Sequence, residues 1–140
     1  MKHIFSVIAS LAILLMSNIS CTHNNGDIGP LFVNWKVTTI EINDKIDHAY
    51  QGNLFFEFQN DVTGMKVVYD NHNVAESYGQ WKLTDKKLLI IYDDKILPPL
   101  LESHMCQGTN ICEVITLTNK NFKFRLVTPH DTYTYTCVKW

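Results

Sequence analysis

The sequence has no excess of positive charge, and this absence excludes one class of function. Its 12 Lys and Arg residues stand against 14 Asp and Glu residues, which gives a formal net charge of -2. Nucleic-acid-binding proteins carry a basic surface that neutralises phosphates, so we expect no nucleic-acid partner. The chain also has only 6 Gly and 4 Pro residues and is 46% hydrophobic, which excludes a collagen-like or disordered chain. At 140 residues it is long enough for one globular domain.

Motifs that mark the common enzyme classes are also absent. The sequence contains no GxSxG, HExxH, Walker or dinucleotide-binding glycine pattern. His72 with Asp70 and Glu76, and His130 with Asp131, fall in or beside predicted turns, where such residues commonly serve solvation and backbone capping. No CxxC or paired-histidine spacing accompanies the cysteines. We therefore expect no enzymatic activity, no metal and no cofactor.

The one long apolar run lies at the N-terminus. Residues 4–16 are almost wholly apolar after a Met-Lys-His start, which is typical of the central region of a signal peptide. At about 13 residues the run is shorter than the roughly 20 residues of a membrane-spanning helix. The segment SNISC, which ends at Cys21, resembles a bacterial lipobox, in which cleavage leaves an acylated cysteine at the new N-terminus. The alternative is an ordinary secretory cleavage near Ser20.

These patterns predict the organisation and location of the chain. Residues 1–20 are interpreted as a lipoprotein-type signal peptide, residues 21–30 as a flexible tether, and residues 31–140 as the folded domain. The tether would reach about 30 Å when extended. We expect an exported protein held at the bacterial cell envelope by acyl chains on Cys21, on the periplasmic or the surface face of the outer membrane.

The remaining cysteines predict a short disulfide loop. If Cys21 is acylated, at most two of the other three cysteines can pair with each other. Cys106 and Cys112 bracket the turn-rich stretch QGTNI, which could bring their Cα atoms to disulfide distance. We predict this pair and a buried free thiol at Cys137. A bond from Cys137 to either of the others, or no bond at all, stays open, because connectivity is not determined by sequence.

From Leu31 onward, apolar residues recur at every second position, in runs separated by turn residues. This alternation predicts eight strands, over residues 32–42, 54–59, 62–69, 74–83, 87–92, 111–118, 122–128 and 132–139. A meander of this kind has two exposed edges, which pairing of the first strand with the last removes. We predict an all-β fold, an antiparallel up-and-down meander closing into an eight-stranded barrel whose interior is filled or holds one small ligand.

Two connections are long enough to have a structure or function of their own, residues 43–52 and 93–110. The second contains Pro98-Pro99 followed by LLESHM. Because proline suits the first turn of a helix, we predict one short helix in this loop after the fifth strand, which caps one end of the barrel. It would act as a hydrophobic plug or as a lid over a cavity.

Several features together resemble a known family. They are Trp35 near the start of the first strand, the long first connection, the run Tyr78-Gly79-Gln80-Trp81, and a meander that follows a lipobox-like leader. In this combination the chain resembles the lipocalin-like lipoproteins of Bacteroidetes, over about Leu31 to Trp140. The resemblance implies an eight-stranded lipocalin-like barrel and an apolar ligand.

Two functions are expected from these features. In the first, the small side chains of Ala75, Ser77 and Gly79 leave space beside Trp81, and a small apolar molecule fills this space and gains about 25 cal/mol per Å² of buried apolar area. In the second, the interior is filled, and the barrel binds another envelope protein through its loops, as an inhibitor or assembly subunit whose partner is unknown. The candidate cavity residues are Phe56, Phe58, Ser77, Gly79, Trp81, Phe124 and Tyr135.

Overall fold

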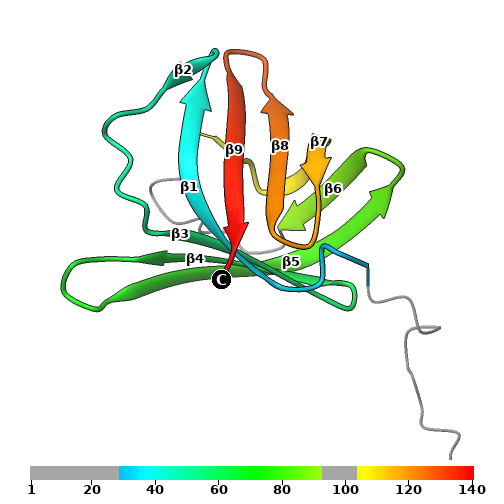
Figure 1. Ribbon diagram of the computed structural model, residues 1–140, viewed down its shortest axis with the longest axis horizontal. Coiled ribbons are helices and arrows are strands. Elements are labelled where there is room, and N and C mark those ends of the chain that lie inside the picture. The colour runs from blue at the N-terminus through cyan, green and yellow to red at the C-terminus, as the bar shows by residue number, and fades with distance from the viewer. Residues whose placement is uncertain (1–28, 93–103) are drawn as a thin grey trace, which may run out of the picture.

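The computed structural model describes residues 29–92 and 104–140, and this part of the chain is all-β (Figure 1). None of these residues forms a helix with the length and apolarity needed to cross a membrane. The nine strands are β1 (Asn34–Ile42), β2 (Lys45–Ile46), β3 (Leu54–Gln59), β4 (Val62–Val68), β5 (Val74–Thr84), β6 (Lys87–Tyr92), β7 (Gly108–Leu117), β8 (Asn121–Val127) and β9 (Thr132–Lys139).

The strands close into an antiparallel barrel, as the alternation predicted. Strands β3 to β9 pair in chain order, and β1 pairs with both β3 and β9. The pairing with β9 runs from Trp35 opposite Lys139 to Ile42 opposite Tyr133, and Figure 1 shows these two strands side by side. Eight strands therefore form the closed barrel. The ninth, β2, is a two-residue strand that turns back onto the end of β1.

Most strand boundaries lie within one or two residues of the predicted ones, and β7 is the exception. It begins at Gly108, whereas Gly108-Thr109-Asn110 was predicted to belong to the preceding loop. The turn-forming residues continue the strand because they pair with the end of β6, from Ile90 opposite Asn110 to Tyr92 opposite Gly108. The long connection is therefore shorter than predicted.

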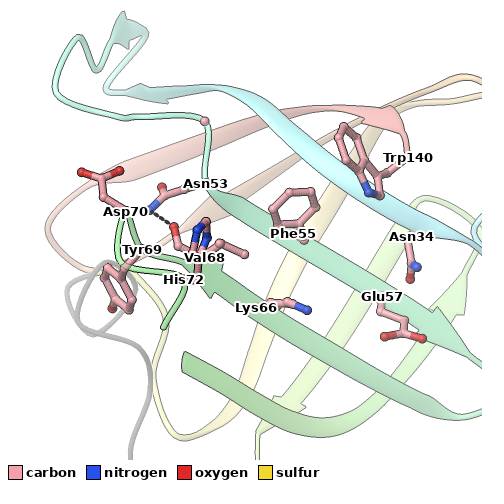
Figure 2. Close-up of a pocket in the computed structure, with 11 residues that line it drawn as sticks. Asn34, Asn53, Phe55, Glu57, Lys66, Val68, Tyr69, Asp70, His72 and Trp140 are labelled. Carbon is pink, nitrogen blue, oxygen red and sulfur yellow. Dashed lines mark hydrogen bonds between the residues drawn. The ribbon is translucent and has the colours of Figure 1, made fainter. Parts of the chain in front are cut away.

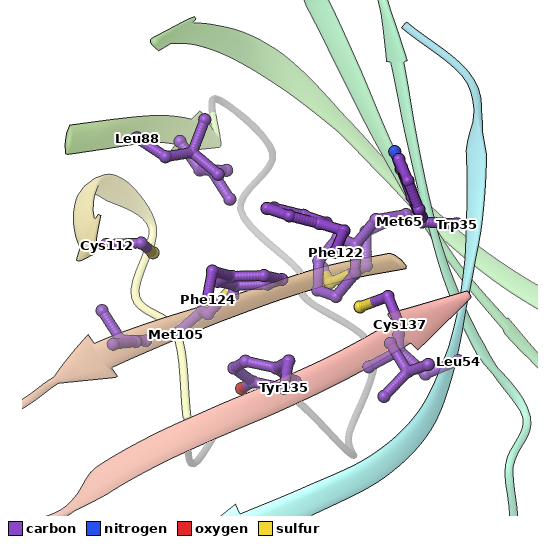
Figure 3. Close-up of a cluster of buried hydrophobic side chains, with 14 of the residues drawn as sticks. Trp35, Leu54, Met65, Leu88, Met105, Cys112, Phe122, Phe124, Tyr135 and Cys137 are labelled. Carbon is purple, nitrogen blue, oxygen red and sulfur yellow. The ribbon is translucent and has the colours of Figure 1, made fainter. Parts of the chain in front are cut away.

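The inward-facing residues of every long strand form one core. The predicted inward faces of β8 and β9 are confirmed, since Phe122, Phe124, Tyr135 and Cys137 are fully buried. Their rings stack on each other, with centroids 4.8 Å apart for Phe122 and Phe124 and 4.9 Å apart for Phe124 and Tyr135 (Figure 3). Alternation along the strands turns most polar residues outward, whereas Thr63, Ser77, Asn110 and Thr134 are buried.

The two ends of the barrel are built differently. At one end, tight connections at Asn60-Asp61, Asp85-Lys86 and residues 118–120 join the strands, and the indole of Trp35 donates a hydrogen bond to the carbonyl of Leu31 at 3.0 Å. At the other end the connections are longer, and His104 and Met105 are buried there. The predicted helix lies largely outside the described residues, and its end at residues 104 and 105 is not helical. Residues 1–20, Cys21 and most of the tether are also outside them.

Candidate functional site

The predicted cavity residues meet inside the barrel, and they fill it. The ring of Phe56 lies 5.4 Å from that of Phe124 and 5.8 Å from that of Tyr135, both edge-on. Phe58 meets Trp81 in the same way at 5.4 Å. Phe56, Phe58, Ser77, Phe124 and Tyr135 are each 0% exposed. The described interior is thus occupied by the protein's own side chains (Figure 3).

The expected space beside Trp81 is filled for a second reason. A Cβ atom added at Gly79 would overlap the carbonyl oxygen of Ile91 and lie 2.8 Å from its carbonyl carbon. The backbone of β6 therefore occupies the room that a side chain on β5 would need. The glycine permits a close approach of two strands, and the row Ala75, Ser77, Gly79 does not leave an open volume for a ligand.

The best-formed pockets of the described residues lie elsewhere. Five of them open on the outer faces of the strands or at one end of the barrel. None of these five is lined by any of the seven predicted cavity residues. The candidate site therefore lies on the outside of the barrel.

The predicted disulfide is not formed in the structure, where Cys106, Cys112 and Cys137 are all free thiols. Because β7 begins before Cys112, that side chain points into the barrel, and burial raises the pKa of its thiol to about 12. Cys106 is exposed, and its Sγ lies 3.5 Å from Oδ1 of Asn110. Cys137 is the buried free thiol that was expected, and burial raises its pKa as well.

A groove with a volume of about 640 Å³ runs over the outer faces of β3 and β4. Its position follows from the strand alternation, because Leu54, Phe56 and Phe58 point inward and leave Phe55 and Glu57 facing outward. Figure 2 shows Trp140, Asn34 and Glu57 toward one end, Tyr69, Asp70 and His72 at the other, and Phe55 and Lys66 between them. The lining residues are Asn34, Gly52, Asn53, Phe55, Glu57, Lys66, Val68, Tyr69, Asp70, His72 and Trp140.

Trp140 is held rigidly although its side chain is 68% exposed. Its backbone N–H donates to the carbonyl of Asn34 at 2.9 Å. The ammonium of Lys36 lies 4.7 Å from the indole centroid, which is a cation–π contact. Phe55 meets the same indole edge-on at 5.5 Å. Three contacts from two strands therefore hold a large aromatic surface in solvent.

Polar side chains lie along the whole groove, and several of them make contacts with neighbouring residues. The amide nitrogen of Asn53 donates to the carbonyl of Val68 at 3.0 Å (Figure 2). The side-chain oxygen of Asn53 is not used in this hydrogen bond. Lys66 forms an ion pair with Glu76 on β5, with 3.6 Å between Nζ and Oε1. Glu57 lies opposite Gly64 on β4 and lines the groove with its carboxylate side chain. Donors and acceptors thus stand beside aromatic rings.

A second, smaller pocket of about 270 Å³ continues the groove along β4. The two pockets share Glu57. In the smaller one, the ring of Tyr78 covers Gly64, where an added Cβ would lie 3.3 Å from the ring. Together the pockets follow β4 from Val62 to Val68, a length of about 20 Å at roughly 3.3 Å per residue.

Another pocket, of about 630 Å³, lies at the end of the barrel where His104 is buried. The imidazole of His104 stacks on Tyr133 with centroids 4.1 Å apart, and its Nδ1 lies 3.0 Å from the hydroxyl of Tyr135. Burial lowers the pKa of His104. Through these contacts the imidazole ring of His104 is part of the packed end of the barrel. In residues 29–92 and 104–140, no three His, Cys, Asp or Glu side chains come together as a metal-binding group.

The groove was missed at the sequence level because its parts are distant in the chain. Phe55 carries a weak signal, as an aromatic residue on the polar face of an alternating strand. Its proximity to Trp140 follows only from the pairing of β1 with both β3 and β9.

Comparison with known proteins shows the fold. No family model and no curated protein matches the chain. Among solved structures, a lipocalin-like protein from Bacteroides uniformis is similar, with a TM-score of 0.65 and 15% identity over 80% of this chain and 100% of that one. An uncharacterised protein from Bacteroides eggerthii is similar too, with a TM-score of 0.60 and 18% identity over 78% of this chain and 99% of that one. The chain thus has a lipocalin-like fold.

Proposed function

We propose that this lipocalin-like barrel is a binding protein without catalytic activity, whose interior supports the fold and whose outer groove receives the ligand. The filled interior speaks against the first of the two functions expected from the sequence. The binding surface proposed here also differs from that of the second function, because it lies on the strand faces of β3 and β4 and not in the loops, and it does not require a protein partner. The observation that carries the proposal is the contrast between fully buried Phe56 and Phe124 and the exposed, fixed Trp140.

Ligand binding on the outside of the barrel costs less free energy than ligand binding in its interior. An apolar molecule in the lumen would have to displace packed rings, and removing one buried Phe from a core costs about 3 to 5 kcal/mol. Binding in the groove needs no such rearrangement, because Trp140 and Phe55 are already ordered at its surface. Preorganised side chains reduce the entropy that binding would otherwise cost.

We also propose that the barrel works at the bacterial cell envelope, exported by residues 1–20 and anchored by acyl chains on Cys21. The lipobox-like segment before Cys21 supports this placement. Mass spectrometry of the N-terminal peptide from a membrane fraction should find acyl chains on Cys21. The Cys21→Ala variant should leave the membrane fraction. An uncleaved or unacylated N-terminus in the membrane fraction would contradict the anchor.

Amide chemical shifts of the 15N-labelled protein test the binding surface. The compounds added to the protein are palmitate, an acidic peptide, a lysine-rich peptide and soluble neutral hexasaccharides. We expect at least one member to shift the amides of Phe55, Glu57 and Lys66, and Phe55→Ser to weaken that response. Ile111→Ser, which changes an exposed residue outside the groove, is the control. Shifts centred on Phe56, Phe124 and Tyr135 with palmitate, or no shifts in the groove, would contradict the proposal.

A further inference from the structure

We propose that the groove over β3 and β4 binds a neutral oligosaccharide, stacked on Trp140 and extended along β4 toward Tyr78. This inference rests on the proposed function and names the class of its ligand. A sugar ring has an apolar face of C–H groups and a rim of hydroxyls. A site for it therefore needs exposed aromatic surface beside groups that donate and accept hydrogen bonds.

An exposed aromatic side chain is present in each of the two pockets, Trp140 in the larger one and Tyr78 in the smaller one. Trp140 is 68% exposed and fixed by Asn34, Lys36 and Phe55. Tyr78 is 52% exposed, lies over Gly64, and donates its hydroxyl to Glu76 at 2.8 Å. Tyr78 lies on β5, and Trp140 directly follows β9 and is bonded through its backbone to Asn34 on β1, so the barrel sets the positions of both.

The polar groups between these rings favour an uncharged ligand. Glu57 and Asp70 bring negative charge to the lining, and the one lysine of the lining, Lys66, is paired with Glu76. Lys36 is engaged with the Trp140 ring, so an anionic ligand would meet the carboxylates of Glu57 and Asp70 with no lysine of the lining left unpaired. Asn53 and Glu57 offer planar amide and carboxylate groups, which suit hydroxyl donors and acceptors.

The backbone argues against a peptide as the occupant. A peptide bound in extended form gains most of its affinity by adding a strand to an exposed sheet edge. Strand β4 is paired along its whole length with β3 on one side and β5 on the other. Recognition in the groove must therefore come from side chains. A length of about 20 Å along β4 suits a ligand of several linked rings better than a single ring.

The test is a titration of the 15N-labelled protein with maltohexaose, laminarihexaose and xylohexaose, each up to about 10 mM, where a complex with a Kd of about 1 mM is mostly formed. We expect at least one hexasaccharide to shift the amides around Phe55, Glu57 and Tyr78. We also expect it to bind at least about tenfold more tightly than its own monosaccharide, because it spans both pockets. Trp140→Ala should weaken binding about tenfold, and Trp140→Phe should retain most of it.

The controls separate this inference from the proposed function. Tyr78→Ser should weaken the hexasaccharide while leaving the monosaccharide unchanged, and Ile111→Ser should change neither. Melting curves check that each variant folds. If no hexasaccharide shifts the groove but a lysine-rich peptide or palmitate does, the oligosaccharide is wrong and the groove remains the binding surface. If no compound shifts the amide resonances of the groove, both the oligosaccharide and the groove as a binding surface are wrong.

Discussion

The hydroxyl of Tyr50 accepts a hydrogen bond from the backbone N–H of Leu54 at 3.0 Å. The same hydroxyl donates to the carbonyl of Val37 at 2.9 Å. Because β1 pairs with β3 only from Asn34 to Lys36, this side chain bridges the strands where their own ladder ends. The first long connection therefore contributes to barrel closure, and the residue responsible lies four positions before β3.

Removal of the Tyr50 hydroxyl should destabilise the protein. Tyr50→Phe leaves a part-buried N–H and a carbonyl without their partner, which costs about 1 to 3 kcal/mol. Tyr92→Phe is the matched control, because the Tyr92 hydroxyl is buried and has no hydrogen-bond partner among the described residues. That change should be neutral or stabilising. Urea unfolding measures both, and a larger loss for Tyr92→Phe than for Tyr50→Phe would contradict these assignments.

Alkaline pH should destabilise the protein because its buried thiol and phenol groups lose their protons. Burial raises the pKa of Cys112 from 9.0 to about 12 and that of Tyr50 from 10.0 to about 12. A raised folded-state pKa means that the unfolded chain loses its proton first, so stability falls as pH rises through this interval. The free energy of unfolding should be flat from about pH 7, above the titration of His104, to pH 9, and should decline between pH 9 and pH 12. In Tyr50→Phe the decline above pH 10 should be shallower, and identical pH profiles would refute the role of Tyr50.

Only one of the three described cysteines should react in the folded state. In a Cys21→Ser variant, a thiol reagent should modify exposed Cys106 quickly and reach Cys112 and Cys137 only on unfolding. Cys106→Ser should abolish the fast reaction. The opposite outcome is a single reactive thiol in the unfolded, unreduced protein, together with a disulfide-linked peptide that joins Cys106 to Cys112. That result would show that the disulfide predicted from the sequence forms.

The alternation of apolar residues was sufficient to predict the barrel, and its limits have physical causes. Strands β3, β6 and β9 have the predicted bounds because each is a short run that begins directly after clear turn residues. The hairpin at Asn60-Asp61 was predicted from residues that tolerate positive φ, and Asn60 has a φ of 50°. Asn43-Asp44 also turns the chain, into β2, and both of its residues have positive φ, 51° and 63°, but a two-residue strand has no periodicity to detect.

Less of the candidate site than of the fold could be predicted from the sequence. Small residues on an inward face indicate either an open space or a close neighbour, and only the approach of Ile91 to Gly79 distinguishes them. The groove depends on a pairing between the two ends of the chain, which brings Trp140 beside Phe55. Local patterns do not contain that information. The leader, the acylated cysteine and the predicted helix lie largely outside the described residues and stay predictions.

Substitution at Gly79 tests the packed interior. Gly79→Ala places a methyl group against the backbone of β6, and overpacking of this kind costs about 1 to 3 kcal/mol or more. Gly29→Ala is the control, since an added Cβ there has no neighbour within 4 Å. Thermal unfolding should show a clear loss for Gly79→Ala and little change for Gly29→Ala. Equal stability of both variants would mean that space is open beside Trp81 after all.

Native mass spectrometry of the protein purified from its own membranes tests most directly whether the barrel is filled by its own side chains. We predict a mass equal to the polypeptide with its covalent modifications, and no apolar molecule released when the barrel is unfolded. A stoichiometric lipid that is released on unfolding, and whose removal shifts the resonances of Phe56, Phe124 and Tyr135, would show that the interior is a ligand cavity.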